Sequence, residues 1–154
     1  MELFFTNKKF TLNGLSCPGI PFITDANMAL IEAVNAYLYY IAVINGSTES
    51  PLTWQTYGRD LLDFFNWLEI QNIAWDLVTK DHLASYRNTM KELVSPHTGR
   101  INAVGTINQR LGTVIRFYDN KFDNGEIKKK PFTKKDISNG WSNDGNLLAH
   151  VSSQ

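Results

Sequence analysis

Between residues 106 and 121, apolar side chains recur with the spacing of a buried helix face. The recurring positions are Ile107, Leu111, Val114, Ile115 and Tyr118. They follow the i, i+4, i+7, i+8, i+11 pattern of one side of an α-helix. A helix of this kind is stable only when its apolar side is covered. The pattern therefore predicts a fold in which this segment packs against other elements.

The opposite side of the same segment is polar and carries no acid. It presents Gln109, Thr113, Arg116 and Asn120, with Arg110 on its flank. Long hydrogen-bond donors suit a DNA groove, where phosphates are anionic and base edges accept hydrogen bonds. The alternative is a helix face that meets only water, as most polar helix faces do.

Length and composition indicate one domain with a real core. The chain has 154 residues, of which 43% are hydrophobic. No apolar run approaches the ~18 residues that a membrane helix needs, and no signal-peptide pattern opens the chain. The lone Cys17 excludes an internal disulfide framework. We therefore expect no membrane partner and a cytoplasmic, nucleoid-associated setting.

The charges are unevenly distributed along a chain whose formal net charge is zero. Residues 1–79 hold three Lys and Arg against eight acids, which gives −5. Residues 80–135 hold twelve Lys and Arg against five acids, which gives +7, and the remaining residues contribute −2. Such asymmetry indicates a polyanionic partner for the basic part.

Four helices are predicted, at residues 25–44, 53–70, 79–93 and 106–121. Asp25, Thr53, Thr79 and Thr106 stand at their starts, where side-chain oxygens cap helices. Asn45-Gly46 and Asn124-Gly125 are stop and turn signals. In the second and third helices the apolar stripes are Tyr57, Leu61, Phe64, Phe65 and Leu68, then Leu83, Tyr86, Met90 and Leu93.

These elements predict an all-α fold, a compact bundle of four main helices. Residues 1–24 form an irregular amino-terminal arm, with short strands at 3–5 and 9–12 as the alternative. In the first helix, the stripe comprises Leu30, Ile31, Val34, Leu38 and Ile41. The helical domain covers residues 25–132, and residues 133–154 read as a flexible linker.

The order of these signals resembles one family. Thr53-Trp54-Gln55-Thr56-Tyr57, Asp60-Leu61 and Phe64-Phe65-Asn66-Trp67-Leu68 are similar to the opening helix pair of a known domain. Its next helix is resembled by Val78-Thr79-Lys80-Asp81-His82-Leu83 with Tyr86-Arg87. Its last helix and exit turn are resembled by residues 106–111, 115–118, 125–127 and 130–132. That domain is the SAM-like core-binding domain of tyrosine recombinases, the phage integrases.

The resemblance implies a helical domain that grips duplex DNA at a recombination half-site and touches neighbouring protomers there. It also implies which residues face the DNA. On the second and fourth helices these are Thr53, Gln55, Thr56, Arg59, Thr106, Gln109, Arg110, Thr113 and Arg116. In the exit turn, Lys128, Lys129 and Lys130 are expected to contact phosphates, which positions a protein without reading sequence.

The family's catalytic tyrosine has no match in these residues, so we expect a binding domain of a strand-transferring recombinase that does not itself cut or join DNA. Tyr57, Tyr86 and Tyr118 lie on apolar stripes and are interpreted as core residues. No catalytic residues, cofactor or metal site are predicted. The residues His82, His97 and His150 lack ligand spacing, and the Asp60/Asp63 pair lacks a partner histidine.

Two alternatives stay open. Trp54, Trp67 and Trp75 are expected to pack in the helical core, and base stacking is the second reading. For the chain as a whole, the alternative function is a helical protein–protein interaction module. Its signature would be an exposed apolar patch around Tyr39 and Tyr40. An intact small enzyme is the weakest hypothesis, because no acid, base and nucleophile come together.

Overall fold

The computed structural model describes residues 1–45, 50–94 and 98–133. The chain divides into two compact units, Met1–Asn66 and Trp67–Gln154, and each is described by itself. Three parts of the sequence-based prediction lie outside the described residues: the helix stop at Gly46, the loop position of His97, and the linker from residue 134 onwards.

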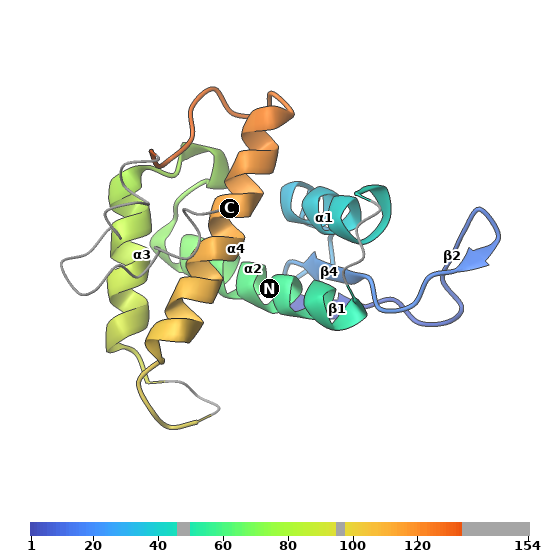
Figure 1. Ribbon diagram of the computed structural model, residues 1–154, viewed down its shortest axis with the longest axis horizontal. Coiled ribbons are helices and arrows are strands. Elements are labelled where there is room, and N and C mark those ends of the chain that lie inside the picture. Colours follow the sequence, from blue (N-terminus) through green and yellow to red (C-terminus); the bar gives the residue numbers. More distant parts are fainter. Residues whose placement is uncertain (46–49, 95–97, 134–154) are drawn as a thin grey trace. The chain divides into compact units, whose positions relative to one another are not determined.

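The amino-terminal arm is present, and it is made of four short strands. These are β1 (Glu2–Phe5), β2 (Thr11–Leu12), β3 (Leu15–Ser16) and β4 (Pro21–Thr24). β1 pairs antiparallel with β4, and β2 pairs with β3 in a hairpin at one end of the arm (Figure 1). Asn13 and Gly14 both have positive φ at the hairpin turn, as a two-residue Asn-Gly turn requires. The fold is therefore only approximately all-α.

Helix α2 (Pro51–Gln71) begins in the first unit and ends in the second, and in the first unit the β1–β4 sheet packs closely on it at Gly58. A Cβ atom added at Gly58 would lie 2.9 Å from Cβ of Pro21 and 3.1 Å from Cδ1 of Leu3. Both distances are shorter than ordinary contacts. The helix and the sheet approach this closely because residue 58 has no side chain.

The first helix is shorter than predicted. Helix α1 spans Glu32–Tyr39 and continues into a π-helical turn, η1 (Tyr40–Ile44). The prediction that Asp25 caps this helix was wrong. Its Oδ1 accepts hydrogen bonds from the N–H groups of Asn27 and Ala29, at 2.8 and 3.0 Å, and so closes a turn before the helix.

Helix α1 is joined to the sheet by a pair of hydrogen bonds. The Asn35 side chain accepts a bond from the Ile23 N–H at 2.7 Å and donates one to the Ile23 carbonyl at 2.8 Å. Ile23, Val34 and Leu38 are each 0% exposed, so these bonds lie beside the core of the unit. Leu30, predicted to belong to the apolar stripe, is 65% exposed because it precedes the helix.

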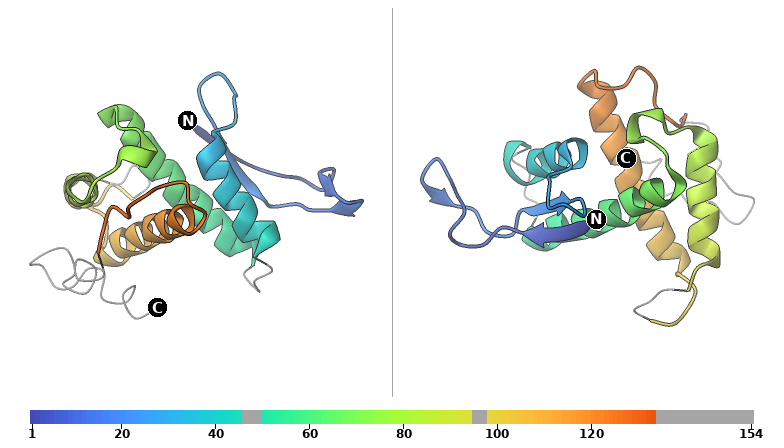
Figure 2. Two further views of the ribbon diagram at one scale, coloured as in Figure 1. Left: turned by 90° about the horizontal axis from the view of Figure 1, so that it is seen from above. Right: turned by 180° about the vertical axis from the view of Figure 1, so that it is seen from behind.

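In the second unit, helices α3 (Lys80–Glu92) and α4 (Val104–Asp123) lie side by side, as Figures 1 and 2 show. A short 3-10 helix, η2 (Trp75–Leu77), precedes α3. The predicted Thr79 cap is confirmed: its side chain accepts from the His82 N–H, and the His82 ring accepts from the Thr79 N–H. Local sequence is enough to specify such a reciprocal cap.

The predicted core of this unit is largely confirmed. The five stripe residues of α4, from Ile107 to Tyr118, are each no more than 3% exposed. Leu83, Tyr86 and Met90 of α3 are buried as well, and the rings of Trp67 and Tyr86 lie 5.2 Å apart. Leu93 is 59% exposed, because the helix has already ended at Glu92.

Candidate nucleic-acid interface

The DNA-facing side chains predicted on α4 before Asp119 are at least partly exposed, with one exception. Thr106 and Gln109 are exposed, and Arg110 and Arg116 are half-buried. No Asp or Glu occurs in α4 before Asp119. This part of the helix therefore supplies hydrogen-bond donors and positive charge and contributes no carboxylate.

The exception is Thr113, whose placement on the groove-facing side was wrong. Its side chain is 0% exposed, and its hydroxyl donates to the Gln109 carbonyl at 3.2 Å. All residues from 111 to 115 are buried, so α4 is covered on every side at this level. Thr113 has no accessible atom to offer a ligand in this structure.

The starts of α2 and α4 differ from the prediction. Thr53 lies inside the first turn of α2, where its N–H donates to the Ser50 carbonyl at 2.9 Å, so Thr53 is not the cap. Helix α4 begins at Val104 with Ala103 at the cap position and no side-chain cap bond. Thr106 is therefore not a cap either. The first N–H groups of α4 have no intrahelical partner, and residues 103–106 are exposed.

On α2, the predicted contact residues are partly accessible. Arg59 is exposed, whereas Thr53, Gln55 and Thr56 are half-buried. The Thr56 hydroxyl donates to the Leu52 carbonyl at 3.1 Å, one turn earlier. This bond leaves the hydroxyl oxygen able to accept a further hydrogen bond.

The three consecutive lysines after α4 have different surroundings. Lys128 and Lys129 are exposed. The Lys130 ammonium lies 2.7 Å from a carboxylate oxygen of Asp119 and 5.2 Å from the centre of the Phe122 ring. Lys130 thus has a partner of its own, which reduces the charge that it can offer to a phosphate.

A fourth lysine, which sequence reasoning missed, is buried at the end of α4. Lys121 is 1% exposed, and its ammonium lies 3.2 Å from Glu126 and over the rings of Trp75 and Phe117 at 5.7 and 5.5 Å. The signal was present in the sequence. Residue 121 follows Val114 and Tyr118 at helical spacing, on the stripe that the apolar residues mark.

The tyrosines behave as packing residues. Tyr86 and Tyr118 are each 1% exposed, and Tyr57 is half-buried. The Tyr118 hydroxyl donates to the Trp75 carbonyl at 2.7 Å. Burial, and to a smaller extent the Asp76 carboxylate, raise the pKa of the Tyr118 phenol well above its usual range. The Tyr118 phenol therefore remains protonated at neutral pH.

Trp67 is confirmed as a core residue at 7% exposed, while Trp54 and Trp75 are half-buried. Trp75 packs edge-on against Phe117, with ring centres 5.7 Å apart. Among the residues that the structure describes, no group of three or more His, Cys, Asp or Glu is arranged to hold a metal ion. In the same residues, no helix is both long and apolar enough to cross a bilayer.

A comparison with known protein families identifies the family of this chain. Residues 34–124, more than half of the chain, match the family described as phage integrase, N-terminal SAM-like domain. The chain belongs to this family. The match corresponds to the core-binding domain of tyrosine recombinases, proteins of DNA integration and recombination. Neither the curated proteins nor the solved structures contain a significant match.

The match to the SAM-like domain contains α2 to α4 and all but the first two residues of α1, and it ends at Asn124, the cap residue after α4. The four strands of the arm and the residues after Asn124 lie outside the match. The lysines at 128–130 therefore follow the phage integrase domain directly.

Proposed function

We propose that this SAM-like domain grips duplex DNA at a recombination half-site for a tyrosine recombinase. One observation carries the proposal: the part of α4 before Asp119 combines Thr106, Gln109, Arg110 and Arg116 and contains no acid. Arginine and glutamine are the side chains that pair with base edges and phosphates in the major groove. Family membership independently supports a DNA-binding role.

Two further features support contact with the DNA backbone. The exposed Lys128 and Lys129 can neutralise phosphates, and the uncapped start of α4 presents backbone N–H groups beside positive helix-dipole charge. On α2, Arg59 is the accessible cation of the proposed set, with Thr53, Gln55 and Thr56 around it. Thr113 is removed from the set because it is buried.

We further propose that this chain binds DNA without cutting it and that strand transfer belongs to the full recombinase. Tyr118, the one tyrosine of α4, already donates a hydrogen bond to the Trp75 carbonyl and resists ionisation. A nucleophilic tyrosine needs access to a phosphate, which a 1% exposed ring does not have.

The proposal is tested by fluorescence anisotropy with a generic duplex across a salt series. Neutralisation of about 4 to 6 phosphates gives a slope of log K against log salt of roughly −4 to −5. The Arg110→Ala/Arg116→Ala double variant is expected to weaken binding and to reduce the slope by about 2. The matched control is Lys8→Ala/Lys9→Ala, which removes the same charge from two exposed positions in the arm. Equal affinities of a folded double variant and the wild type would refute the assignment.

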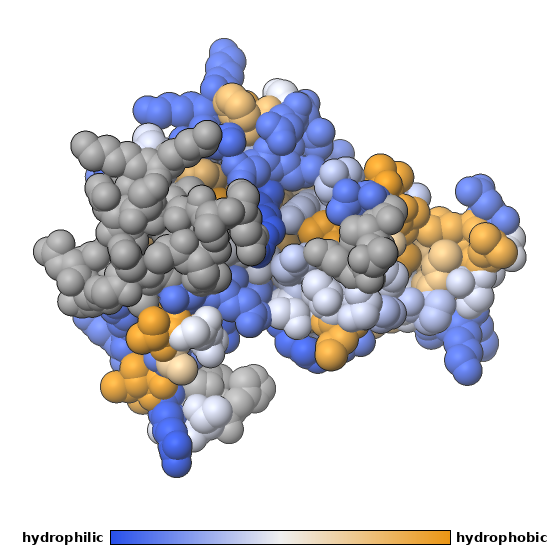
Figure 3. All heavy atoms as spheres, viewed as in Figure 1, coloured by the Kyte–Doolittle hydropathy of each residue, from blue (hydrophilic) through white to orange (hydrophobic). Residues whose placement is uncertain are grey.

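A second candidate function, protein–protein interaction, is favoured by one surface of the first unit. A groove of about 370 Å³ is lined by Phe10, Phe22, Leu30 and Tyr39 with their neighbours, and none of its lining residues is charged. Phe10, Leu30 and Tyr39 are 40, 65 and 39% exposed. Figure 3 shows hydrophobic side chains gathered along the arm near its β2–β3 hairpin.

Crosslinking with and without DNA separates the two functions. Neighbouring recombinase protomers that meet only on a half-site crosslink only when duplex DNA is present. A stable oligomer without DNA, lost on Leu30→Asp or Tyr39→Asp, supports the interaction module instead. Exposed apolar patches of this kind commonly mark such contacts.

A further inference from the structure

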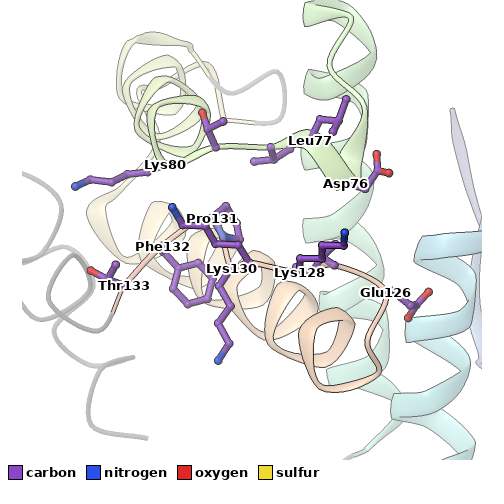
Figure 4. A pocket seen from close by; sticks show the side chains of 13 residues that line it. Asp76, Leu77, Lys80, Glu126, Lys128, Lys130, Pro131, Phe132 and Thr133 are labelled. Atoms are coloured by element: carbon purple, nitrogen blue, oxygen red, sulfur yellow. The ribbon is translucent and has the colours of Figure 1, made fainter.

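The second unit contains a groove of about 600 Å³ that the proposed DNA contacts do not explain. One wall is residues 76–80, which lead from η2 into α3, and the other is residues 126–133, which follow α4. Figure 4 shows the two segments passing one another, with the lining side chains of both around the groove. Its volume lies within the roughly 300–1,000 Å³ of typical ligand-binding clefts.

The floor of the groove is apolar, and one apolar side chain stands at its edge. Val78, Ile127 and Phe132 line it and are each less than a tenth exposed, at 9, 9 and 8%. Leu77, at the edge, is 69% exposed. A partner that covers Leu77 and reaches the floor removes apolar surface from water, which is the main favourable term in association. Phosphate groups gain nothing from such a floor.

The exposed charges around the groove are mainly positive. Lys80, Lys128 and Lys129 line it and are exposed, and the exposed acids Asp76 and Glu126 lie beside them. Of these two acids, Glu126 already pairs with buried Lys121. The groove therefore complements carboxylates next to an apolar side chain.

Both walls are held in place by contacts to α4. The Tyr118 hydroxyl holds the Trp75 carbonyl at the start of the first wall, at 2.7 Å. The second wall is fixed at two points, by Lys121 with Glu126 and by Asp119 with Lys130. A preformed groove spares a ligand much of the cost of ordering the protein.

We propose that this groove binds a short acidic segment of another protein. An apolar side chain of that segment packs on Leu77 and Phe132, and its carboxylates meet Lys80, Lys128 and Lys129. The inference goes beyond DNA binding. It shares Lys128 and Lys129 with the proposed DNA contacts, so its test uses Leu77 and Lys80, which are not among those contacts, and contains no DNA.

The probe is a short fluorescein-labelled peptide of Asp and Glu that contains one Leu and one Trp. Its anisotropy is measured with the whole chain at low salt. Leu77→Asp and Lys80→Glu are each expected to weaken binding about tenfold or more, as loss of a central contact does. The matched controls are Leu15→Asp, at a residue 71% exposed on the β2–β3 hairpin, and Lys8→Glu in the arm. Both controls are expected to bind like wild type.

A second measurement does not depend on variants. In ¹H–¹⁵N spectra of the wild-type chain, the peptide is expected to shift the amides of residues 77–80 and 127–132, while the amides of β1 to β4 stay unchanged. These shifts decide the matter if Leu77→Asp does not give a folded circular dichroism spectrum.

Three results would overturn the inference. The first is no binding of the peptide at about 1 mM, where even the weakest specific contacts are detectable. The second is that a peptide in which Ser replaces Leu and Trp binds as tightly as the original peptide. Charge alone would then account for the binding. The third is an equal loss of duplex affinity on Leu77→Asp, which would assign the groove to DNA.

Discussion

The ammonium of Lys121 lies 3.2 Å from a carboxylate oxygen of Glu126, with the lysine side chain 1% and the glutamate side chain 41% exposed. The two partners are thus unequal. Glu126 can be hydrated when it loses its partner, whereas Lys121 cannot. The ion pair closes the turn after α4, where the Glu126 N–H also donates to the Lys121 carbonyl at 2.9 Å.

Removing the two partners should therefore have different effects. Glu126→Gln leaves a buried ammonium without its counter-charge and is expected to destabilise the fold by about 2 kcal/mol. Lys121→Met keeps the contacts with Trp75 and Phe117 through a thioether and is expected to stay within about 1 kcal/mol of wild type. Urea denaturation followed by circular dichroism measures both. Equal losses would argue against this account.

Tyr118 gives the protein a defined response to alkaline pH. Its folded-state pKa is raised above the value of about 10 in an unfolded chain. Its contribution to stability is therefore complete below about pH 10 and is lost as the pH rises further, by up to about 1.4 kcal/mol per pH unit.

The variant Tyr118→Phe isolates this effect. It lacks the bond to the Trp75 carbonyl and is expected to be about 1 kcal/mol less stable near neutral pH. Between about pH 9 and pH 11, the unfolding free energy of this variant should fall less than that of the wild type. Parallel pH profiles of the two proteins would show that Tyr118 titrates normally.

Gly58 and Gly105 are both helical glycines, yet substitution by alanine should change stability in opposite directions. At Gly58 the new methyl group would lie 2.9 Å from the rigid Pro21 ring, and such overpacking costs about 1 to 3 kcal/mol. The higher helix propensity of alanine than of glycine offsets at most about 1 kcal/mol of this cost. At Gly105 nothing lies within 4 Å, so alanine is expected to stabilise by up to about 0.5 to 1 kcal/mol. Thermal unfolding of both variants checks the signs.

Thr79 and Thr106 form a second matched pair. Thr79 accepts the His82 N–H at the start of α3, so Thr79→Ala is expected to cost about 1 kcal/mol. Thr106 lies exposed inside α4 and caps nothing, so Thr106→Ala should change stability by less than about 0.5 kcal/mol. A loss of DNA affinity in a fully stable Thr106→Ala protein would assign the side chain to binding.

Lys129 and Lys130 are neighbours in sequence that should differ in their effect on DNA binding. Lys129 is exposed, whereas Lys130 is held by Asp119 at 2.7 Å. Lys129→Ala is expected to reduce the salt slope by about 0.9, as loss of one phosphate contact does. Lys130→Ala should reduce it by less. If Lys130→Ala has the larger effect, the Asp119 pair opens when DNA binds.

Local signals in the sequence predicted α3 and α4 well. The Thr79 cap, the stripe from Ile107 to Tyr118 and the turn at Asn124-Gly125 all depend on residues within a few positions of one another. Gly125 has a φ of 75°, the left-handed conformation that the turn signal implies. Periodicity and capping are properties of short segments, so a single sequence contains them.

The features that the sequence did not predict depend on contacts outside the predicted helices. Asp25 looked like a helix cap, but its side chain closes a turn with Asn27 and Ala29, and Leu30 pairs with Thr24 of β4, so α1 begins only at Glu32. Thr113 has a polar side chain at a position that the core surrounds, and Lys121 finds its partners in Trp75 and Glu126. Which polar side chains a fold buries depends on such neighbours, and helical spacing alone does not identify them.

The hydrogen bonds between Asn35 and Ile23 cross the start of the region that matches the family. The region matched by the SAM-like family begins at Val34, which leaves the Ile23 partner outside it. A recombinant fragment that starts at Val34 would keep the Asn35 amide and lose both groups that satisfy it. It would also uncover the side of α2 that Pro21 and Leu3 approach at Gly58. The family match thus starts after the arm, although α1 and α2 make close contacts with β4 and β1.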